Sequence, residues 1–320
     1  MSQAVYAIII SFVVCIASFP LFIPYLIKLK FGQYIRGEGP ESHKVKAGTP
    51  TMGGIMIIVS FLVAALVFAR GNPEVALVAA ATGAFGFIGF LDDFISLKRK
   101  TNLGLRAYQK LIGQIAISIG FIALWSTMPG FSSELIVPFF PDVTLDVGFL
   151  FPALACLVFL SATNGSNLTD GVDGLASSVT VIIAVFFMFA AWFLGSEVLP
   201  VAGALIGALL GFIIFNSKPA RVFMGDTGSL ALGGFVAGIA LILGMPLFLI
   251  IVAIIYVIES LSVIIQVGYF KLTKGKRFFK MAPIHHSFEL SGWSETKIVA
   301  LFSVITTIAC FIGYLALVGI

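Results

Sequence analysis

Carboxylate side chains stand out in this sequence because they interrupt long apolar stretches. Asp92 and Asp93 end one such stretch, and Asp226 begins another within the segment FMGDTGSLALGG. Mg²⁺ is usually held by one or two protein carboxylates, with substrate phosphates and water completing its shell. Adjacent residues on a helix point about 100° apart, so Asp92 and Asp93 can meet different partners. We interpret Asp226 as a metal ligand; the alternatives are a helix cap at Asp226 and an ordinary polar helix end at the pair.

A second polar patch is the segment NGSNLTDGVDGLA, which starts at Asn164. Asn164, Asn167, Asp170 and Asp173 recur every three residues, and on a helix the first three share one side. Gly171 favours a looser turn through which backbone can approach a ligand. Amides and carboxylates at this spacing suit ribose hydroxyls, a base edge or a metal-bound phosphate. The alternative is a cap and turn before the next apolar stretch.

The segment APIHHSFELSGW contains His285 and His286, two of the three histidines in the chain. Paired histidines next to a basic run indicate contact with phosphate. Zinc is not expected, because the sequence has neither HExxH spacing nor paired cysteines. The three cysteines all lie within apolar runs and are interpreted as small core residues, namely Cys15, Cys156 and Cys310.

The elements that must position these residues are membrane spans. Of 320 residues, 59% are hydrophobic and only 11% are charged, whereas soluble domains are about a quarter charged. A helix needs about 20 apolar residues to cross a bilayer. The apolar runs predict an all-α integral membrane protein, one polytopic domain over 1–320, with ten spans near 5–27, 51–69, 74–91, 107–128, 148–163, 175–194, 198–215, 228–244, 246–270 and 296–319.

The distribution of basic residues predicts the orientation of these spans. Every Lys and Arg except Arg70 lies in or beside a loop that follows an odd-numbered span. The positive-inside rule therefore places those loops in the cytoplasm and both termini outside. All the polar patches then lie on the cytoplasmic face, while Pro129–Val147 forms an external loop with a small hairpin. Transporters place ionisable residues near the bilayer midplane, so this arrangement favours an enzyme working at the membrane surface.

Five motifs also carry a family resemblance. The segments GTPTMGG, LDD, NLTDGVDGLA, FMGDTGSLALGG and PIHHSFE, spanning about Lys44 to Glu289, resemble in order the polyprenyl-phosphate N-acetylhexosamine-1-phosphate transferase superfamily. Within it they are most similar to the branch that uses UDP-N-acetylmuramoyl-pentapeptide. The resemblance implies that this donor and undecaprenyl phosphate react, with Mg²⁺, to give lipid I and UMP in peptidoglycan synthesis. It also implies a multi-pass protein of the bacterial plasma membrane, a homodimer and no nucleic-acid partner.

The resemblance implies roles for individual residues as well. Asp226 would be the principal Mg²⁺ ligand, Asp92 or Asp93 would act on the lipid phosphate, and His285 would contact phosphate at the reaction centre. The remaining substrate-binding residues would be Lys46, Thr51, Lys100, Lys110, Asn164, Asn167, Asp170, Gly171, Asp173, Asn216, Phe223 and His286. In this set Phe223 would stack on uracil. The family commonly has three consecutive histidines, so Ser287 here indicates that the third position is tolerant.

Two alternatives stay open. A sister enzyme that moves N-acetylglucosamine-1-phosphate onto the same lipid would share the acidic motifs, although the PIHHSFE segment favours the muramoyl-pentapeptide donor. A transporter or lipid scramblase would release no UMP from a nucleotide donor.

Overall fold

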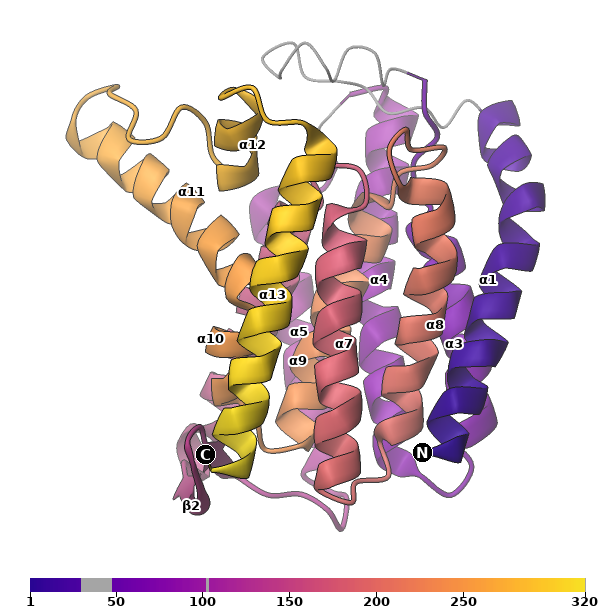
Figure 1. The fold of residues 1–320 in the computed structure, drawn as a ribbon, viewed down its shortest axis with the longest axis vertical. Helices are drawn as coiled ribbons and strands as arrows, with labels where there is room; N and C mark the ends of the chain where they lie inside the picture. The colour runs from indigo at the N-terminus through magenta and orange to yellow at the C-terminus, as the bar shows by residue number, and fades with distance from the viewer. Residues whose placement is uncertain (30–47, 102–103, 320) are drawn as a thin grey trace.

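The apolar runs form long helices that stand side by side in the computed structural model, which describes residues 1–29, 48–101 and 104–319 (Figure 1). Nine helices in these residues are long and apolar enough to cross a membrane. They are α1 (Ser2–Lys28), α4 (Pro73–Arg99), α5 (Ala107–Trp125), α6 (Phe151–Thr169), α7 (Leu175–Phe193), α8 (Leu199–Asn216), α9 (Gly225–Ile242), α11 (Ile254–Leu272) and α13 (Glu295–Val318). The predicted all-α membrane class is confirmed.

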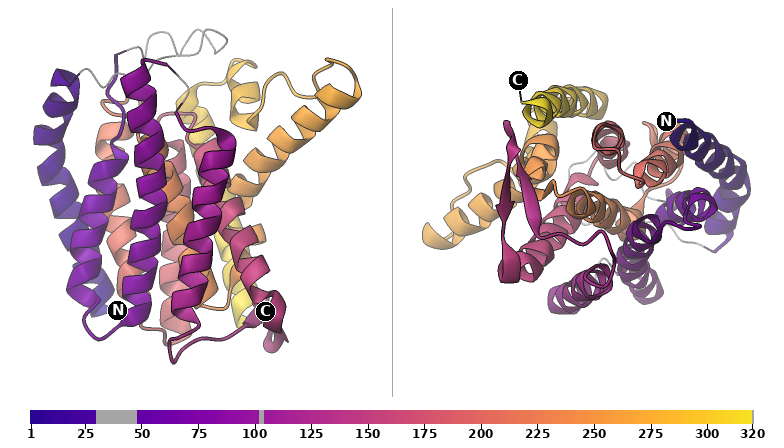
Figure 2. Two further views of the ribbon diagram at one scale, coloured as in Figure 1. Left: turned by 180° about the vertical axis from the view of Figure 1, so that it is seen from behind. Right: turned by 90° about the horizontal axis from the view of Figure 1, so that it is seen from below.

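Four of the ten predicted spans differ clearly from the structure. Those predicted to end near 91 and 163 continue to Arg99 in α4 and to Thr169 in α6, and two others differ in length or continuity. The span predicted near 51–69 is the shorter helix α3 (Gly54–Phe68), of 15 residues. The span predicted over 246–270 is three pieces: a 3-10 turn η2 (Pro246–Phe248), α10 (Leu249–Val252) and α11, separated at Ala253. No Gly or Pro stands at this break, so the apolar run looks continuous. The break lets α11 lean away from the other helices, as Figures 1 and 2 both show.

The helices that carry the acidic residues touch backbone to backbone. α9 packs against α4, α6 and α3 near the middle of the bundle. A side chain at Gly89 of α4 would collide with the backbone carbonyl of Asp226 on α9. Small residues permit such close approach between membrane helices. Gly89 therefore sets the distance between the end of α4 and the start of α9.

The predicted external hairpin is confirmed as a hairpin. β1 (Glu134–Val137) pairs antiparallel with β2 (Phe140–Asp146). Backbone bonds of 2.8 Å from Ile136 N–H to the Gly244 carbonyl and from Phe139 N–H to the Ala316 carbonyl attach it to the bundle. It lies at the same end as the beginning of α1 and the end of α13, while α12 (Ile284–Glu289) lies at the opposite end (Figure 1).

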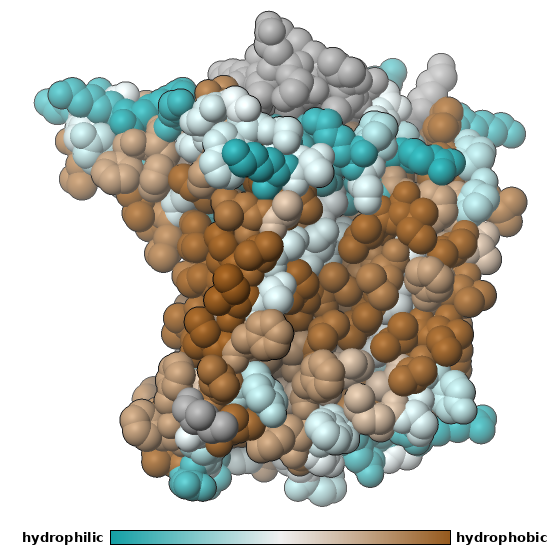
Figure 3. All heavy atoms as spheres, viewed as in Figure 1, coloured by the Kyte–Doolittle hydropathy of each residue, from teal (hydrophilic) through white to brown (hydrophobic). Residues whose placement is uncertain are grey.

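The surface has the distribution expected of a protein in a bilayer. Figure 3 shows apolar side chains covering the middle of the visible face, with polar ones gathered at both ends. The structure thus places both termini at one end of the bundle and α12 at the other. That the α12 end faces the cytoplasm stays a prediction from the basic residues.

Candidate active site

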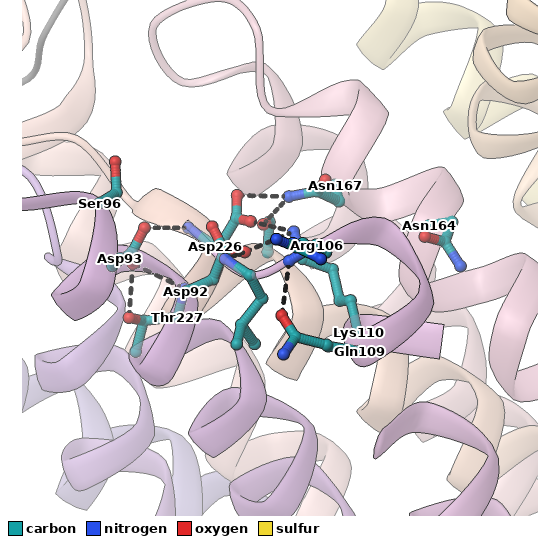
Figure 4. A network of polar contacts seen from close by, with 12 residues as sticks. Asp92, Asp93, Ser96, Arg106, Gln109, Lys110, Asn164, Asn167, Asp226 and Thr227 are labelled. Carbon is teal, nitrogen blue, oxygen red and sulfur yellow. Dashed lines mark hydrogen bonds and ion pairs between the residues drawn. The ribbon is translucent and has the colours of Figure 1, made fainter. Parts of the chain in front are cut away.

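Three carboxylates from two helices meet where α4 ends and α9 begins (Figure 4). Asp92 and Asp93 lie near the end of α4, and Asp226 lies in the first turn of α9. One oxygen from each lies within 4.8 Å of the others. We call these three residues the acidic cluster. Residues separated by more than 130 positions in the sequence are brought together here by the contact between α4 and α9.

Within the cluster, the Asp93 carboxylate caps the N-terminus of α9. It accepts hydrogen bonds from the N–H of Asp226 at 3.1 Å, the N–H of Thr227 at 2.9 Å and the Thr227 hydroxyl at 2.6 Å. The first N–H groups of a helix have no partner within the helix, so Asp93 satisfies them from a neighbouring helix. The capping alternative for Asp226 is wrong: the N-cap position is Met224, and no side chain caps the helix from there.

The other two carboxylates share one lysine. The Lys110 ammonium on α5 lies 2.5 Å from Asp226 Oδ2 and 3.3 Å from Asp92 Oδ1. Asp92 also accepts the N–H of Leu105 at 3.0 Å. Asp92 and Asp93 therefore face different partners, as the sequence indicated. Three carboxylates against one ammonium leave an excess of negative charge in the cluster, which favours a cation.

Asn167 holds Asp226 from the side of α6. Its amide donates to Asp226 Oδ1 at 2.8 Å and to the Ser229 hydroxyl at 2.9 Å. Asn164, one turn earlier, instead donates to Gln114 of α5 at 3.2 Å and to the Leu160 carbonyl. The structure thus brings Asn167 to the acidic cluster and gives Asn164 a bond to α5. Gln114, a buried amide in an apolar run, was not singled out from the sequence.

The structure separates the three lysines that were predicted to bind substrate. Lys110 joins the cluster, whereas Lys100 is exposed at the C-cap of α4 with a left-handed φ of 53°. Lys46 lies outside the described residues. Contact of Lys100 and Lys46 with substrate stays a prediction.

Replacing Lys110 by methionine should lower kcat/KM for UMP release by about a hundredfold, because a positioned charge next to reacting phosphates is lost. The variant should also gain more thermal stability from Mg²⁺ than the wild type, since the remaining carboxylates lack their ammonium partner. Lys98→Met, which removes an exposed lysine from α4, is the control and should behave like the wild type. Turnover of Lys110→Met within a few fold of wild type would remove this lysine from the site.

The loops that follow α6 and α8 are joined by buried polar groups. Asp173 accepts the N–H of Ala220 at 3.1 Å. Asn216 accepts the N–H of Gly174 at 3.0 Å and donates to the Val222 carbonyl at 2.9 Å. These bonds give Asp173 and Asn216 roles in positioning the two loops. Their contact with a nucleotide stays a prediction, as does that of Asp170, the C-cap of α6.

The segments GTPTMGG and FMGDTGS lie side by side. Phe223 donates its N–H to the Pro50 carbonyl, and its own carbonyl accepts from Gly53, both at 2.8 Å. Gly54 donates to the Met224 carbonyl at 2.9 Å. Thr51, a buried residue, therefore lies next to the start of α9. The pairing brings these two motifs to the acidic cluster, while uracil stacking by Phe223 stays a prediction.

The two predicted histidines lie on the short helix α12. His285 is buried, and its Nδ1 lies 3.0 Å from Oε1 of Glu259 on α11. A side chain at Gly171 would collide with the His285 ring. His286 Nδ1 lies 2.7 Å from Glu289 Oε2. Because His285 is buried, a phosphate reaches it only if α12 or the turn at Gly171 moves.

Two further residues, Glu259 of α11 and Ser287 of α12 itself, contribute to the surroundings of the histidines. Glu259 was not singled out from the sequence, although a carboxylate inside an apolar span is a signal that could have found it. The Ser287 hydroxyl donates to the Met281 carbonyl at 2.6 Å and accepts its N–H at 3.1 Å. This hydroxyl therefore closes a local loop, which gives a physical reason for serine at the third position.

The contact between Gly171 and His285 can be tested by adding one methyl group. Gly171→Ala should reduce turnover at least tenfold and lower the free energy of unfolding by about 1–3 kcal/mol, the usual cost of overpacking. Gly120→Ala in α5 is the matched control, because its methyl would meet nothing within 4 Å. UMP release and thermal unfolding of the two variants are compared. Equal behaviour of both would show that His285 is not confined by Gly171.

Residues 75–244 of this polytopic helical bundle match the family model described as glycosyl transferase family 4, so the chain is a membrane-embedded member of that class. Residues 46–58 match the phospho-N-acetylmuramoyl-pentapeptide-transferase signature 1. Curated relatives with that enzyme name include one from Clostridium novyi (strain NT), 50% identical over 99% of this chain and 98% of the relative. Others are from Clostridioides difficile (strain 630), 48% identical over 98% of each chain, and Clostridium botulinum (strain Alaska E43 / Type E3), 51% identical over 97% of this chain and 95% of the relative. The chain belongs to the phospho-N-acetylmuramoyl-pentapeptide-transferase family.

Proposed function

We propose that this chain transfers phospho-N-acetylmuramoyl-pentapeptide from its UDP conjugate to undecaprenyl phosphate, forming lipid I and UMP. The observation that carries the proposal is the 50% identity to a relative of that name over 99% of the chain. The acidic cluster beside Lys110 supports it, because the chemistry of a diphosphate donor calls for charge neutralisation.

The proposed reaction exchanges one bond to phosphorus for another. An oxygen of the lipid phosphate bonds to the phosphorus that carries the sugar, and the bond from that phosphorus to the bridging oxygen of UMP breaks. The second pKa of a phosphate monoester is about 6, so the attacking group is already largely ionised near neutral pH. A strong general base is therefore not required, and the main tasks of the protein are positioning and charge neutralisation.

The acidic cluster fits Mg²⁺, which is bound through hard oxygen donors. Asp226 and Asp92 would hold the ion, because the oxygens of Asp93 are taken up by the N–H and hydroxyl groups at the start of α9. When bound, Mg²⁺ would neutralise charge on the phosphates. Asn167 orients Asp226 through its 2.8 Å bond. Lys110 pairs with both Asp92 and Asp226 and would contact a phosphate that enters the site.

The proposed transfer takes place at one surface of the membrane. The positive-inside distribution predicts that the acidic cluster faces the cytoplasm, where a soluble nucleotide donor is available. The lipid acceptor reaches the same face from the bilayer around the apolar belt of the bundle (Figure 3). We also propose that the chain works as one transferase domain over 1–320 and as a homodimer.

The test is UMP release by purified protein with undecaprenyl phosphate and Mg²⁺. UDP-N-acetylmuramoyl-pentapeptide and UDP-N-acetylglucosamine are supplied in parallel. Turnover of only the first is the expected result, and turnover of only the second would move the chain to the sister activity. Silence with both donors, in protein shown to be folded, would favour a transporter.

A further inference from the structure

The helix α11 buries a carboxylate within an apolar span. Its buried residues are Ile255, Tyr256, Glu259 and Ser262, which recur at three- and four-residue steps and form one inward-facing stripe. The outer face of the helix is apolar and exposed, as at Leu261 and Ile265. A buried carboxylate is costly unless a charged or hydrogen-bonding partner compensates it. Glu259 therefore calls for a partner inside the bundle.

That partner is His285. Glu259 Oε1 lies 3.0 Å from His285 Nδ1, and both side chains are buried. Among the described residues, Glu259 Oε2 and His285 Nε2 have no hydrogen-bond partner. The other side of the ring faces Gly171, where no side chain would fit. The imidazole is thus held between α11 and the turn after α6.

We propose that Glu259 is the positioning residue of His285, a role that rests on the proposed function of the chain. A carboxylate at Nδ1 determines which ring nitrogen carries a proton toward it and fixes the orientation of the ring. Nε2 is then the nitrogen left to meet a phosphate. It points at the turn that follows Asn167, the residue that holds Asp226. Glu259 therefore acts on the reaction through His285, without touching substrate.

A double-mutant cycle on turnover tests this role. UMP release from UDP-N-acetylmuramoyl-pentapeptide is measured for wild type, Glu259→Gln, His285→Ala and the double variant. Glu259→Gln should lower kcat about 10–100-fold, the usual cost of losing a residue that orients a functional histidine. Its KM for the donor should change by less than about threefold, because no substrate contact is removed. In the His285→Ala background the same change should cost nothing further.

Control variants separate this role from a structural one. Ser262→Ala removes a buried hydroxyl of the same stripe that bonds to the backbone carbonyl of Glu259 and not to its carboxylate, so kcat should stay near that of wild type. If Glu259→Gln does not yield folded protein, the same cycle is run with Glu259→Asp. Unchanged kcat in Glu259→Gln, or the full loss repeated in the absence of His285, would overturn the proposal.

NMR of the histidine ring nitrogens tests the contact between Glu259 and His285 without relying on turnover. The chain has only three histidines, so their ring-nitrogen NMR signals are few, and His285→Ala assigns those of His285. These signals should shift in Glu259→Gln and stay unchanged in Ser262→Ala. Signals of His285 that are identical in wild type and Glu259→Gln would show that Glu259 does not hold the ring. Wild-type turnover in the assay above reports the proposed function independently.

Discussion

Asp226→Asn is expected to reduce turnover by about a thousandfold or more while leaving the protein folded. Asparagine keeps the size of the side chain and an oxygen for the bond from Asn167, but it removes the negative charge. The Lys110 ammonium then loses its partner at 2.5 Å and keeps only Asp92 at 3.3 Å. The proposed Mg²⁺ site loses its principal ligand.

Thermal unfolding with and without Mg²⁺ gives this prediction a readout besides activity. Mg²⁺ should stabilise the wild type, because an ion that binds only the folded state raises the free energy of unfolding. It should not stabilise Asp226→Asn. Without Mg²⁺ the stability of the variant should stay close to that of wild type, since the relief of repulsion among three clustered carboxylates offsets the loss of the ion pair with Lys110.

Asp142→Asn is the control for this variant, because it changes an exposed carboxylate in the hairpin at the other end of the bundle. It should keep both turnover and the response to Mg²⁺. Near-normal turnover of Asp226→Asn, or an unchanged stabilisation by Mg²⁺, would remove Asp226 as the metal ligand.

His285→Ala is expected to damage turnover far more than Ser287→Ala. Loss of an imidazole at the reaction centre should cost about 10²–10⁴ in kcat. The Ser287 hydroxyl bonds only to the backbone of Met281 among the contacts described, so its loss should cost about 1 kcal/mol of stability and little activity. Both variants are assayed for UMP release under saturating donor.

The stability of the histidine variant needs its own control. His285→Ala leaves the buried Glu259 carboxylate without its partner, which destabilises the folded state. His285→Gln restores a donor for Glu259 and should be more stable, yet still be deficient in turnover. Recovery of activity in His285→Gln would show that the ring acts only through packing. A larger effect of Ser287→Ala than of His285→Ala would overturn the interpretation of this loop.

Much of the fold follows from local pattern. Apolar runs of about 20 residues specify spanning helices whatever their neighbours, because every backbone group must be satisfied within the segment in lipid. No such local signal marks the break between α10 and α11 at Ala253, where neither Gly nor Pro stands. Just after the break α11 packs against α6, where Tyr256 lies close to Gly165, and neither segment alone encodes that contact.

The sequence by itself determined the membrane class, most of the spans and the gathering of polar residues at the ends of helices, because hydrophobicity and charge act through composition and local spacing. Only the tertiary structure decided which polar residues meet. Of the predicted lysines, Lys110 contacts the acidic cluster. Asp93 bonds to the start of α9, and Glu259 pairs with His285. The physical reason is that hydrogen bonds and ion pairs need atoms within about 3 Å, a distance set by the packing of helices remote in sequence.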